Sequence, residues 1–229
     1  DSWGELGQNN RTKYSSPTQI GTGTDWTHVA SNSQSLATKT NGTLWMWGHN
    51  ANGTLGDNTN VPRSSPIQVG TNTTWDGTRM AAAGQSVMAI KTDGSLWTWG
   101  QFGYGIDGRN SFAWPYWKRS SPAQLGTDTT WDQVCKLGQY TAAAIKNDNT
   151  LWVWGAGGDG KLGLNAPGTY SSPVQLSGTN WAKVQSIGGS YAFGATKTDG
   201  TMWFWGRPVV GSFGNNEGGY PSLYFSSPT

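Results

Sequence analysis

A short stretch of sequence recurs four times along this chain and constrains its fold more than any other feature. Each copy contains a two-residue turn signal followed by the motif Leu-Trp-x-Trp-Gly, with methionine in place of leucine in the last copy. The copies end at Gly48, Gly100, Gly155 and Gly206, so the period is roughly 50 residues. A repeat of this length predicts an array of similar units, each packed against its neighbours.

The turn signals predict hairpins. They are Asn41-Gly42, Asp93-Gly94, Asp148-Asn149 and Asp199-Gly200. Such pairs tolerate positive φ angles, and we predict that each forms a type I′ turn between two antiparallel strands. Strand-like segments such as Val87–Lys91 and Thr141–Lys146 lead into the turns.

The strand after each turn is apolar in both of its alternation phases. In Leu44-Trp45-Met46-Trp47 no polar side chain alternates with the apolar ones. A strand with one wet face would alternate apolar and polar residues. We therefore predict that this strand is covered on both faces, as in a sheet stacked between two similar sheets. The closing glycine then lets the chain leave the strand sharply.

Two further landmarks complete each unit. A Ser-Ser-Pro segment opens a short strand, with proline at its head, and a lone tryptophan opens another. Four short strands per repeat predict an all-β fold, a β-propeller of four-stranded antiparallel blades. The complete units span residues 15–48, 64–100, 120–155 and 171–206, with partial units at 1–4 and 226–229.

Composition limits the class of protein. Charged residues make up 12% of the 229 residues, whereas there are 34 glycines and 15 tryptophans. The net charge of +2 is too small to indicate nucleic-acid binding. The single cysteine, Cys135, excludes an intrachain disulfide and a cysteine-based zinc site. No apolar run approaches the ~18 residues that a membrane span needs, so we expect no membrane insertion.

These motifs resemble those of a known family. The motif Leu-Trp-x-Trp-Gly, the segment Asn50–Gly56 and the pattern Ser-Ser-Pro-x-Gln-Val at Ser64–Val69 together resemble the regulator of chromosome condensation repeat. The extra tryptophan after each Ser-Ser-Pro strand is similar to the bacterial and viral branch of that family. The resemblance covers nearly the whole chain and implies a propeller fold. It does not imply one function, because the family includes nucleotide-exchange factors for small GTPases, β-lactamase inhibitors and surface proteins.

The number of blades raises the question of closure. An open array of four blades would leave an apolar sheet face wet at each end, and each face of about 500 Å² would forgo about 12 kcal/mol. We therefore expect the ring to be completed by further chain or by other subunits, as in a homo-oligomer or a larger assembly. The chain opens within a repeat and so resembles a segment of something longer. The alternative architecture is a six-bladed tectonin-like lectin, whose motif order fits less well.

The sequence offers no clear catalytic constellation. The two histidines, His28 and His49, lie at non-equivalent repeat positions, and His49 shares a variable position with Gln101, Ala156 and Arg207. Too few bases are present for a Ser-His-Asp set. Three acids lie in the connections, Asp57, Asp107 and Asp159, but the alternating acids of a Ca²⁺ loop are absent. We predict a protein that is not an enzyme and has no cofactor or metal.

Aromatic side chains gather in the two longest connections and are the candidate binding site. Tryptophan and tyrosine provide large contact area at low entropic cost, and a basic rim adds charge. The candidates are Phe112, Trp114, Tyr116, Trp117, Lys118, Arg119, Tyr220 and Tyr224. The alternative is that these rings only cap neighbouring blades.

The leading functional hypothesis is a non-enzymatic recognition or structural propeller on an extracellular or virion surface, such as a phage tail or fibre. It would bind a protein or a glycan through its inter-blade loops, the variable part of a rigid ring. A second hypothesis is an inhibitor or adaptor resembling the propeller β-lactamase inhibitors. Guanine-nucleotide exchange is a third, for which the sequence shows no projecting wedge.

Overall fold

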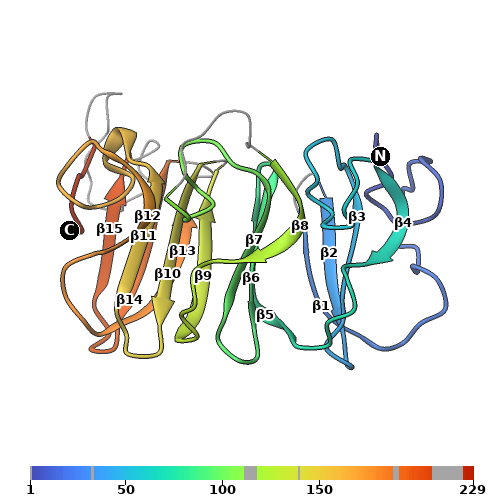
Figure 1. Ribbon diagram of the computed structural model, residues 1–229, viewed down its shortest axis with the longest axis horizontal. Coiled ribbons are helices and arrows are strands. Elements are labelled where there is room, and N and C mark those ends of the chain that lie inside the picture. Colours follow the sequence, from blue (N-terminus) through green and yellow to red (C-terminus); the bar gives the residue numbers. More distant parts are fainter. Residues whose placement is uncertain (1, 32–33, 111–117, 139, 188–190, 208–223) are drawn as a thin grey trace. The chain divides into compact units, whose positions relative to one another are not determined.

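The computed structural model describes residues 2–31, 34–110, 118–138, 140–187, 191–207 and 224–229 (Figure 1). Within these ranges all regular structure is β-strand, apart from one short 3₁₀ segment, η1 (Gly158–Gly160). The chain divides into two compact units. Unit 1 comprises Asp1–Gln101 with Pro115–Gln124, and unit 2 comprises Phe102–Trp114 with Leu125–Thr229.

Unit 1 contains two four-stranded antiparallel sheets, blade 1 and blade 2. The strands of blade 1 are β1 (Trp26–Ser31), β2 (Gln34–Lys39), β3 (Leu44–Gly48) and β4 (Arg63–Gln68). Those of blade 2 are β5 (Trp75–Ala83), β6 (Ser86–Lys91), β7 (Leu96–Gln101) and β8 (Lys118–Gln124). Strands pair in sequence order, and β1 and β2 lie against β5. The first strand of each blade is therefore the one nearest to the neighbouring blade.

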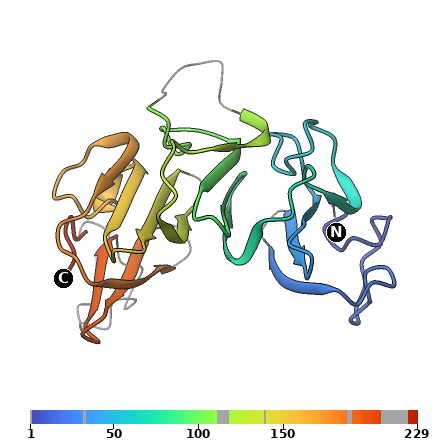
Figure 2. The same ribbon diagram turned by 60° about the horizontal axis from the view of Figure 1, so that its bottom comes forward.

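Unit 2 repeats this arrangement. Blade 3 consists of β9 (Trp131–Leu137), β10 (Thr141–Lys146), β11 (Leu151–Ala156) and β12 (Thr169–Gln175). Blade 4 has β13 (Trp181–Ile187), β14 (Ala192–Lys197) and β15 (Met202–Gly206). The C-terminal segment adds a fourth row to blade 4, because Phe225 bridges Gly206 and Thr229 exchanges backbone hydrogen bonds with Phe204. The two sheets lie side by side in both views (Figures 1 and 2). The prediction of repeated four-stranded antiparallel blades is confirmed.

The blades are offset by one strand from the sequence units that begin at Ser-Ser-Pro. In blades 1 to 3 the Ser-Ser-Pro strand is the outermost one and pairs with the Leu-Trp-x-Trp-Gly strand that precedes it, as β4 pairs with β3. Residues 226–229 likewise continue blade 4 instead of opening a new sheet. Pro66 lies inside β4 and not at its head. It is tolerated there because β4 is an edge strand with an irregular register beside Gly48.

The hairpin turns differ from the predicted type I′ geometry. In blade 1 the amide of Gly42 donates to the carbonyl of Lys39 at 2.9 Å, so Thr40 and Asn41 are the central residues. Only Gly42, at φ 74°, has a positive φ, whereas a type I′ turn needs two such residues. The Asn41 side chain accepts from the amide of Thr43 at 3.1 Å. The turn is thus of type I followed by a left-handed residue, and the Asn or Asp is selected by its side-chain hydrogen bond.

Both faces of the Leu-Trp-x-Trp-Gly strand bury side chains in blade 1, but a described sheet covers only the face of Leu44 and Met46. Leu44 and Met46 are fully buried against Trp75 and Trp99 of blade 2. Trp47 on the opposite face is also buried. In blade 4 the prediction does not hold for Met202, the equivalent of Leu44, which is 62% exposed. No described sheet lies against that face of blade 4.

The first tryptophan of each strand is half-buried beneath a lysine. In blade 1 the Nζ of Lys39 lies 4.7 Å from the ring centroid of Trp26 and 4.9 Å from that of Trp45. Lys91, Lys146 and Lys197 repeat this sandwich in the other three blades. The lysine stem covers apolar ring surface while its charge faces the aromatic quadrupole. This explains how a partly wet strand face can carry so many tryptophans.

Candidate functional site

The predicted aromatic site lies mostly outside the described residues. Phe112, Trp114, Tyr116, Trp117 and Tyr220 all fall there, so their grouping stays a prediction. Lys118 and Arg119 begin β8, and both are exposed at the edge of blade 2. Tyr224 is 53% exposed, immediately before the bridge that Phe225 makes. The structure does not bring Tyr224 together with Lys118 and Arg119 in one compact unit.

The described part of the connections is anchored by the second tryptophan of each Leu-Trp-x-Trp-Gly strand. The indole N–H donates to a backbone carbonyl in the connection that precedes the blade. These bonds are Trp47 to Glu5 (2.8 Å), Trp99 to Thr54 (2.8 Å), Trp154 to Ile106 (2.9 Å) and Trp205 to Lys161 (3.0 Å). A buried indole N–H needs such an acceptor, so the connection is held where the tryptophan requires it.

Two further contacts complete this anchor, which we call the clasp. In unit 1 the amide of Asn58 donates to the carbonyl of Ser120 at 2.7 Å. Asn58 has φ 62°, a conformation that asparagine tolerates better than most residues. Gly53 lies so close to β8 that a Cβ atom there would stand 2.6 Å from the Cα of Ser120. The same backbone bond recurs at Asn9, Asn110 and Asn165.

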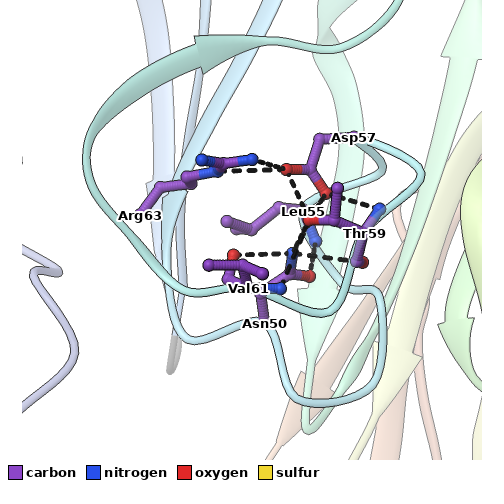
Figure 3. A network of polar contacts seen from close by, with 6 residues as sticks. All are labelled: Asn50, Leu55, Asp57, Thr59, Val61 and Arg63. Carbon is purple, nitrogen blue, oxygen red and sulfur yellow. Dashed lines mark hydrogen bonds and ion pairs between the residues drawn. The ribbon is translucent and has the colours of Figure 1, made fainter.

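The connection between β3 and β4 is further ordered by the buried side chain of Asn50 (Figure 3). Its amide nitrogen donates to Asp57 Oδ1 at 3.0 Å and to the carbonyl of Val61 at 3.0 Å. Its Oδ1 accepts from the amide of Leu55 at 2.9 Å. One side chain therefore ties three points of the connection together, and the exposed Val61 is held at a defined place on it.

Asp57 closes this network with an ion pair. Arg63 donates from Nε and from one terminal nitrogen to Asp57 Oδ2 at 3.1 and 3.0 Å (Figure 3). Burial by itself would raise the pKa of Asp57, but hydrogen bonds from Thr59, Arg63 and Asn50 outweigh it, and the pKa lies below its ordinary value. The carboxylate side chain is only 8% exposed. The charged form is therefore the one that the connection requires.

We expect the variant Asp57→Asn to be less stable than the parent protein by about 1–2 kcal/mol at pH 7, because the charge-assisted bonds from Arg63 are lost. The folded-state pKa is depressed, so this contribution is present above the unfolded pKa of about 3.9 and is lost as the pH falls through the folded value. Urea unfolding at neutral and acidic pH should show the difference shrinking in acid. Asp159→Asn is the control, since Asp159 is 42% exposed and 3.9 Å from Lys161. Equal losses for both variants would contradict this account.

Three positions of each repeat meet at the end of the blade where the connections lie, and we call each group a loop-end cluster. The positions are the residue before the clasp glycine, the residue before the second strand, and the residue after Trp-Gly. In blade 2 these are Asn52, Gln85 and Gln101, and the amide of Asn52 donates to both glutamines. Blade 1 brings Trp3 to His49 with ring centroids 5.0 Å apart.

The clusters of unit 2 are aromatic and charged. In blade 3 the rings of Tyr104 and Tyr140 lie 4.9 Å apart. In blade 4 the ring of Tyr191 has the guanidinium carbon of Arg207 at 5.6 Å. The sequence alone shows the variable position that His49 shares with Arg207. No motif in the sequence marks Tyr140 or Tyr191. Only the strand register brings these distant residues together.

The remaining chemistry in the described residues is sparse. They contain no group of three or more His, Cys, Asp or Glu side chains placed to hold a metal ion. Burial raises the pKa of the Cys135 thiol to about 11 and lowers that of Lys136 to about 7. A thiol with such a pKa is a poor nucleophile. No helix in the described part of the chain has the length and hydropathy needed to cross a membrane.

Sequence comparison relates part of the chain to known repeats. The model of the regulator of chromosome condensation (RCC1) repeat matches residues 41–90. The chain is 27% identical over 175 residues to the human E3 ubiquitin-protein ligase HERC2. This alignment covers 75% of this chain and 4% of that protein. It is 26% identical over 129 residues to the mitochondrial RCC1 domain-containing protein RUG3 of Arabidopsis thaliana, covering 56% of this chain and 28% of that protein. The chain thus spans a small part of these relatives.

Solved structures agree on the fold. Human WBSCR16 superposes with a TM-score of 0.80 at 19% identity, covering all of this chain and 60% of its own. Prp20p of Saccharomyces cerevisiae superposes with a TM-score of 0.74 at 17% identity, covering 91% of this chain and 51% of its own. Neither match supports a particular bacterial or viral origin. The repeat at residues 41–90 matches the RCC1 repeat, and the four-stranded antiparallel sheets of this chain have the fold of blades in RCC1-like β-propellers.

Proposed function

We propose that this chain is a non-enzymatic recognition module that binds a protein through the connections that join the third and fourth strands of its blades. The clasp is the observation that carries this proposal. In each of four connections the same three contacts tie the connection to a sheet: the indole bond, the backbone bond from asparagine and the close approach of a glycine. The exposed residues of these connections therefore need little further ordering to bind a partner. Binding by a preorganised loop costs less conformational entropy than binding by a free one. Connections on a rigid frame are also where binding residues concentrate.

The comparisons support protein binding at the level of the fold. The structure of Prp20p was described together with its binding to Gsp1p and histones, and Kap60 was solved bound to yeast RCC1 (Prp20). Those partners are properties of the yeast protein. Our chain spans about half of that protein, so the proposal carries over protein binding alone.

The proposal includes an extracellular or virion surface as the setting, with a structural or receptor-binding role such as that of a phage tail or fibre. Its support is compositional: 12% charged residues, one cysteine, and repeats enriched in glycine and tryptophan. The additional tryptophan of each repeat supports the bacterial and viral branch of the family in the same way. Assembly with further copies would cover apolar surface such as Met202. A protein-gripping inhibitor or adaptor would use the same connections.

Site-specific photo-crosslinking tests the proposal. A benzophenone amino acid is placed at Val61, which is 54% exposed on the connection of blade 1, and separately at the exposed Thr92 in the β6–β7 turn at the opposite end. In the cells that produce the protein, the Val61 variant should form a defined adduct with one protein and the Thr92 variant should not. Adducts from Thr92 but none from Val61 would place the binding surface at the wrong end.

A further inference from the structure

The tyrosine pair of blade 3 combines exposure with a strained backbone. Tyr104 is 59% exposed and has φ 55°. A positive φ is uncommon for a residue other than glycine, asparagine or aspartate, and it costs free energy that the fold must offset. The ring of Tyr104 nevertheless packs against that of Tyr140, with the centroids 4.9 Å apart and the planes tilted by 60°. Such strain at an exposed position points to a role beyond packing.

The clasp of blade 3 holds Tyr104 in this conformation. Gly105, the next residue, lies so close to β12 that a Cβ there would stand 2.5 Å from the Cα of Ser171. The carbonyl of Ile106 accepts from the indole of Trp154. On the other side a Cβ at Gly103 would lie 2.6 Å from the ring of Tyr140. The backbone on both sides is thus confined, and the phenol is presented at one fixed place.

The equivalent positions of blade 4 are Asp159, Tyr191 and Arg207, and Lys161 adjoins them. Tyr191 is 42% exposed, and its ring has Lys161 Nζ at 5.5 Å and the guanidinium carbon of Arg207 at 5.6 Å. Lys161 also lies 3.9 Å from Asp159. Within the ranges that the structure describes, no carboxylate forms an ion pair with Arg207. The Arg207 amide donates to the Tyr191 carbonyl at 2.9 Å, which holds the two residues side by side.

We propose that the loop-end clusters of blades 3 and 4 bind an acidic segment of a partner protein, in which an aromatic or apolar side chain stacks on Tyr104 and Tyr140 and a carboxylate pairs with Arg207. This inference rests on the proposed function and names the chemistry of the partner. Tyrosine gives contact area at low entropic cost, and the planar guanidinium of arginine matches a carboxylate through two parallel hydrogen bonds. The loop-end cluster of blade 2 lies at the same repeat positions but carries no charge, since it consists of Asn52, Gln85 and Gln101. We therefore assign the preference for an acidic partner to the clusters of unit 2.

Selection from a phage-displayed library of random peptides tests the partner's chemistry. The whole chain is immobilised, and enriched peptides are synthesised and titrated by fluorescence anisotropy. The expected sequences carry Asp or Glu close to an aromatic residue. Their affinity should fall by about tenfold or more in Arg207→Ala, as a lost charge-assisted bond implies. It should fall similarly in Tyr104→Asn, which removes the ring but keeps a residue that tolerates the positive φ.

Matched variants separate the outcomes. Gln101→Ala occupies the same repeat position as Arg207 in blade 2 and should bind as the parent does. The charge reversal Arg207→Glu should turn the selection toward peptides with Lys or Arg. Peptides without acid enrichment, no enrichment at all, or equal losses in Gln101→Ala and Arg207→Ala would overturn the inference. Binding to neutral sugars on a glycan array that survives Arg207→Glu would assign a sugar instead and also overturn it. The crosslinking at Val61 does not depend on any of these results. A failure of this inference can therefore be told apart from a failure of the proposed function.

Discussion

Replacing Trp99 with alanine is expected to lower the free energy of unfolding by about 4 kcal/mol, because the substitution empties a large buried site. Trp99 is fully buried, its ring lies 5.8 Å from that of Trp75, and its indole donates to Thr54 at 2.8 Å. The substitution removes both the contact between blades 1 and 2 and the anchor of the connection before β4. Urea unfolding followed by far-UV circular dichroism measures the loss.

Two matched variants divide this effect. Trp97→Ala removes the half-buried tryptophan of the same strand, whose ring packs under Lys91, and should cost about 1–2 kcal/mol. Trp99→Phe keeps an aromatic ring but leaves the carbonyl of Thr54 without its indole donor. We expect this variant to lower the free energy of unfolding by about 1–2 kcal/mol. Trp97 and Trp99 lie on the same face of β7, so equal losses from Trp97→Ala and Trp99→Ala would mean that neither the contact with blade 1 nor the bond to Thr54 sets Trp99 apart.

Replacing Gly53 with alanine is expected to cost about 2–5 kcal/mol. The residue has φ 72°, where a Cβ costs about 1–2 kcal/mol, and the new atom would stand 2.6 Å from the backbone of Ser120. That clash must move either the connection or β8, which adds the penalty of an overpacked core. The clasp would open, and the connection should become a site of proteolytic cleavage.

Gly70 is the matched control for Gly53, since it has φ 62° and no atom lies within 4 Å of the place that a Cβ would occupy. Gly70→Ala should therefore show the backbone cost alone, about 1–2 kcal/mol, and no new cleavage between β3 and β4. Limited proteolysis and thermal unfolding of both variants provide the comparison. If the two variants lost equal stability, the close approach of Gly53 to Ser120 would be wrong.

Most of the strands follow from the sequence, although the Ser-Ser-Pro segment at residues 15–20 forms no strand. A strand that is apolar in both phases must be covered on both faces, and Leu44, Met46 and Trp47 are buried in blade 1, with blade 2 against Leu44 and Met46 and the connection at Glu5 beside Trp47. The turn type was not predictable from the dipeptide alone. Asn-Gly suits two turn geometries, and the hydrogen bond from Thr43 to the Asn41 side chain favours the one observed.

The offset between blades and sequence units also could not be read from the motif order. A Ser-Ser-Pro strand can pair with the strand before it or with the one after it, and only the ladder between β3 and β4 decides. The candidate site shows the same limit. The aromatic run at residues 112–117 stands out in the sequence, whereas Tyr104, Tyr140 and Ala156 are an ordinary scatter until the register places them together.

The clasp supports both the fold and the proposed binding surface, and indole proton exchange measured by NMR tests it most directly. Single Trp→Phe variants assign the signals. The indole protons of Trp47, Trp99, Trp154 and Trp205 should exchange slowly, because each donates to a carbonyl of a connection and is largely removed from water. Exchange of these four protons at the rate of free indole, while the sheet amides stay protected, would contradict the account.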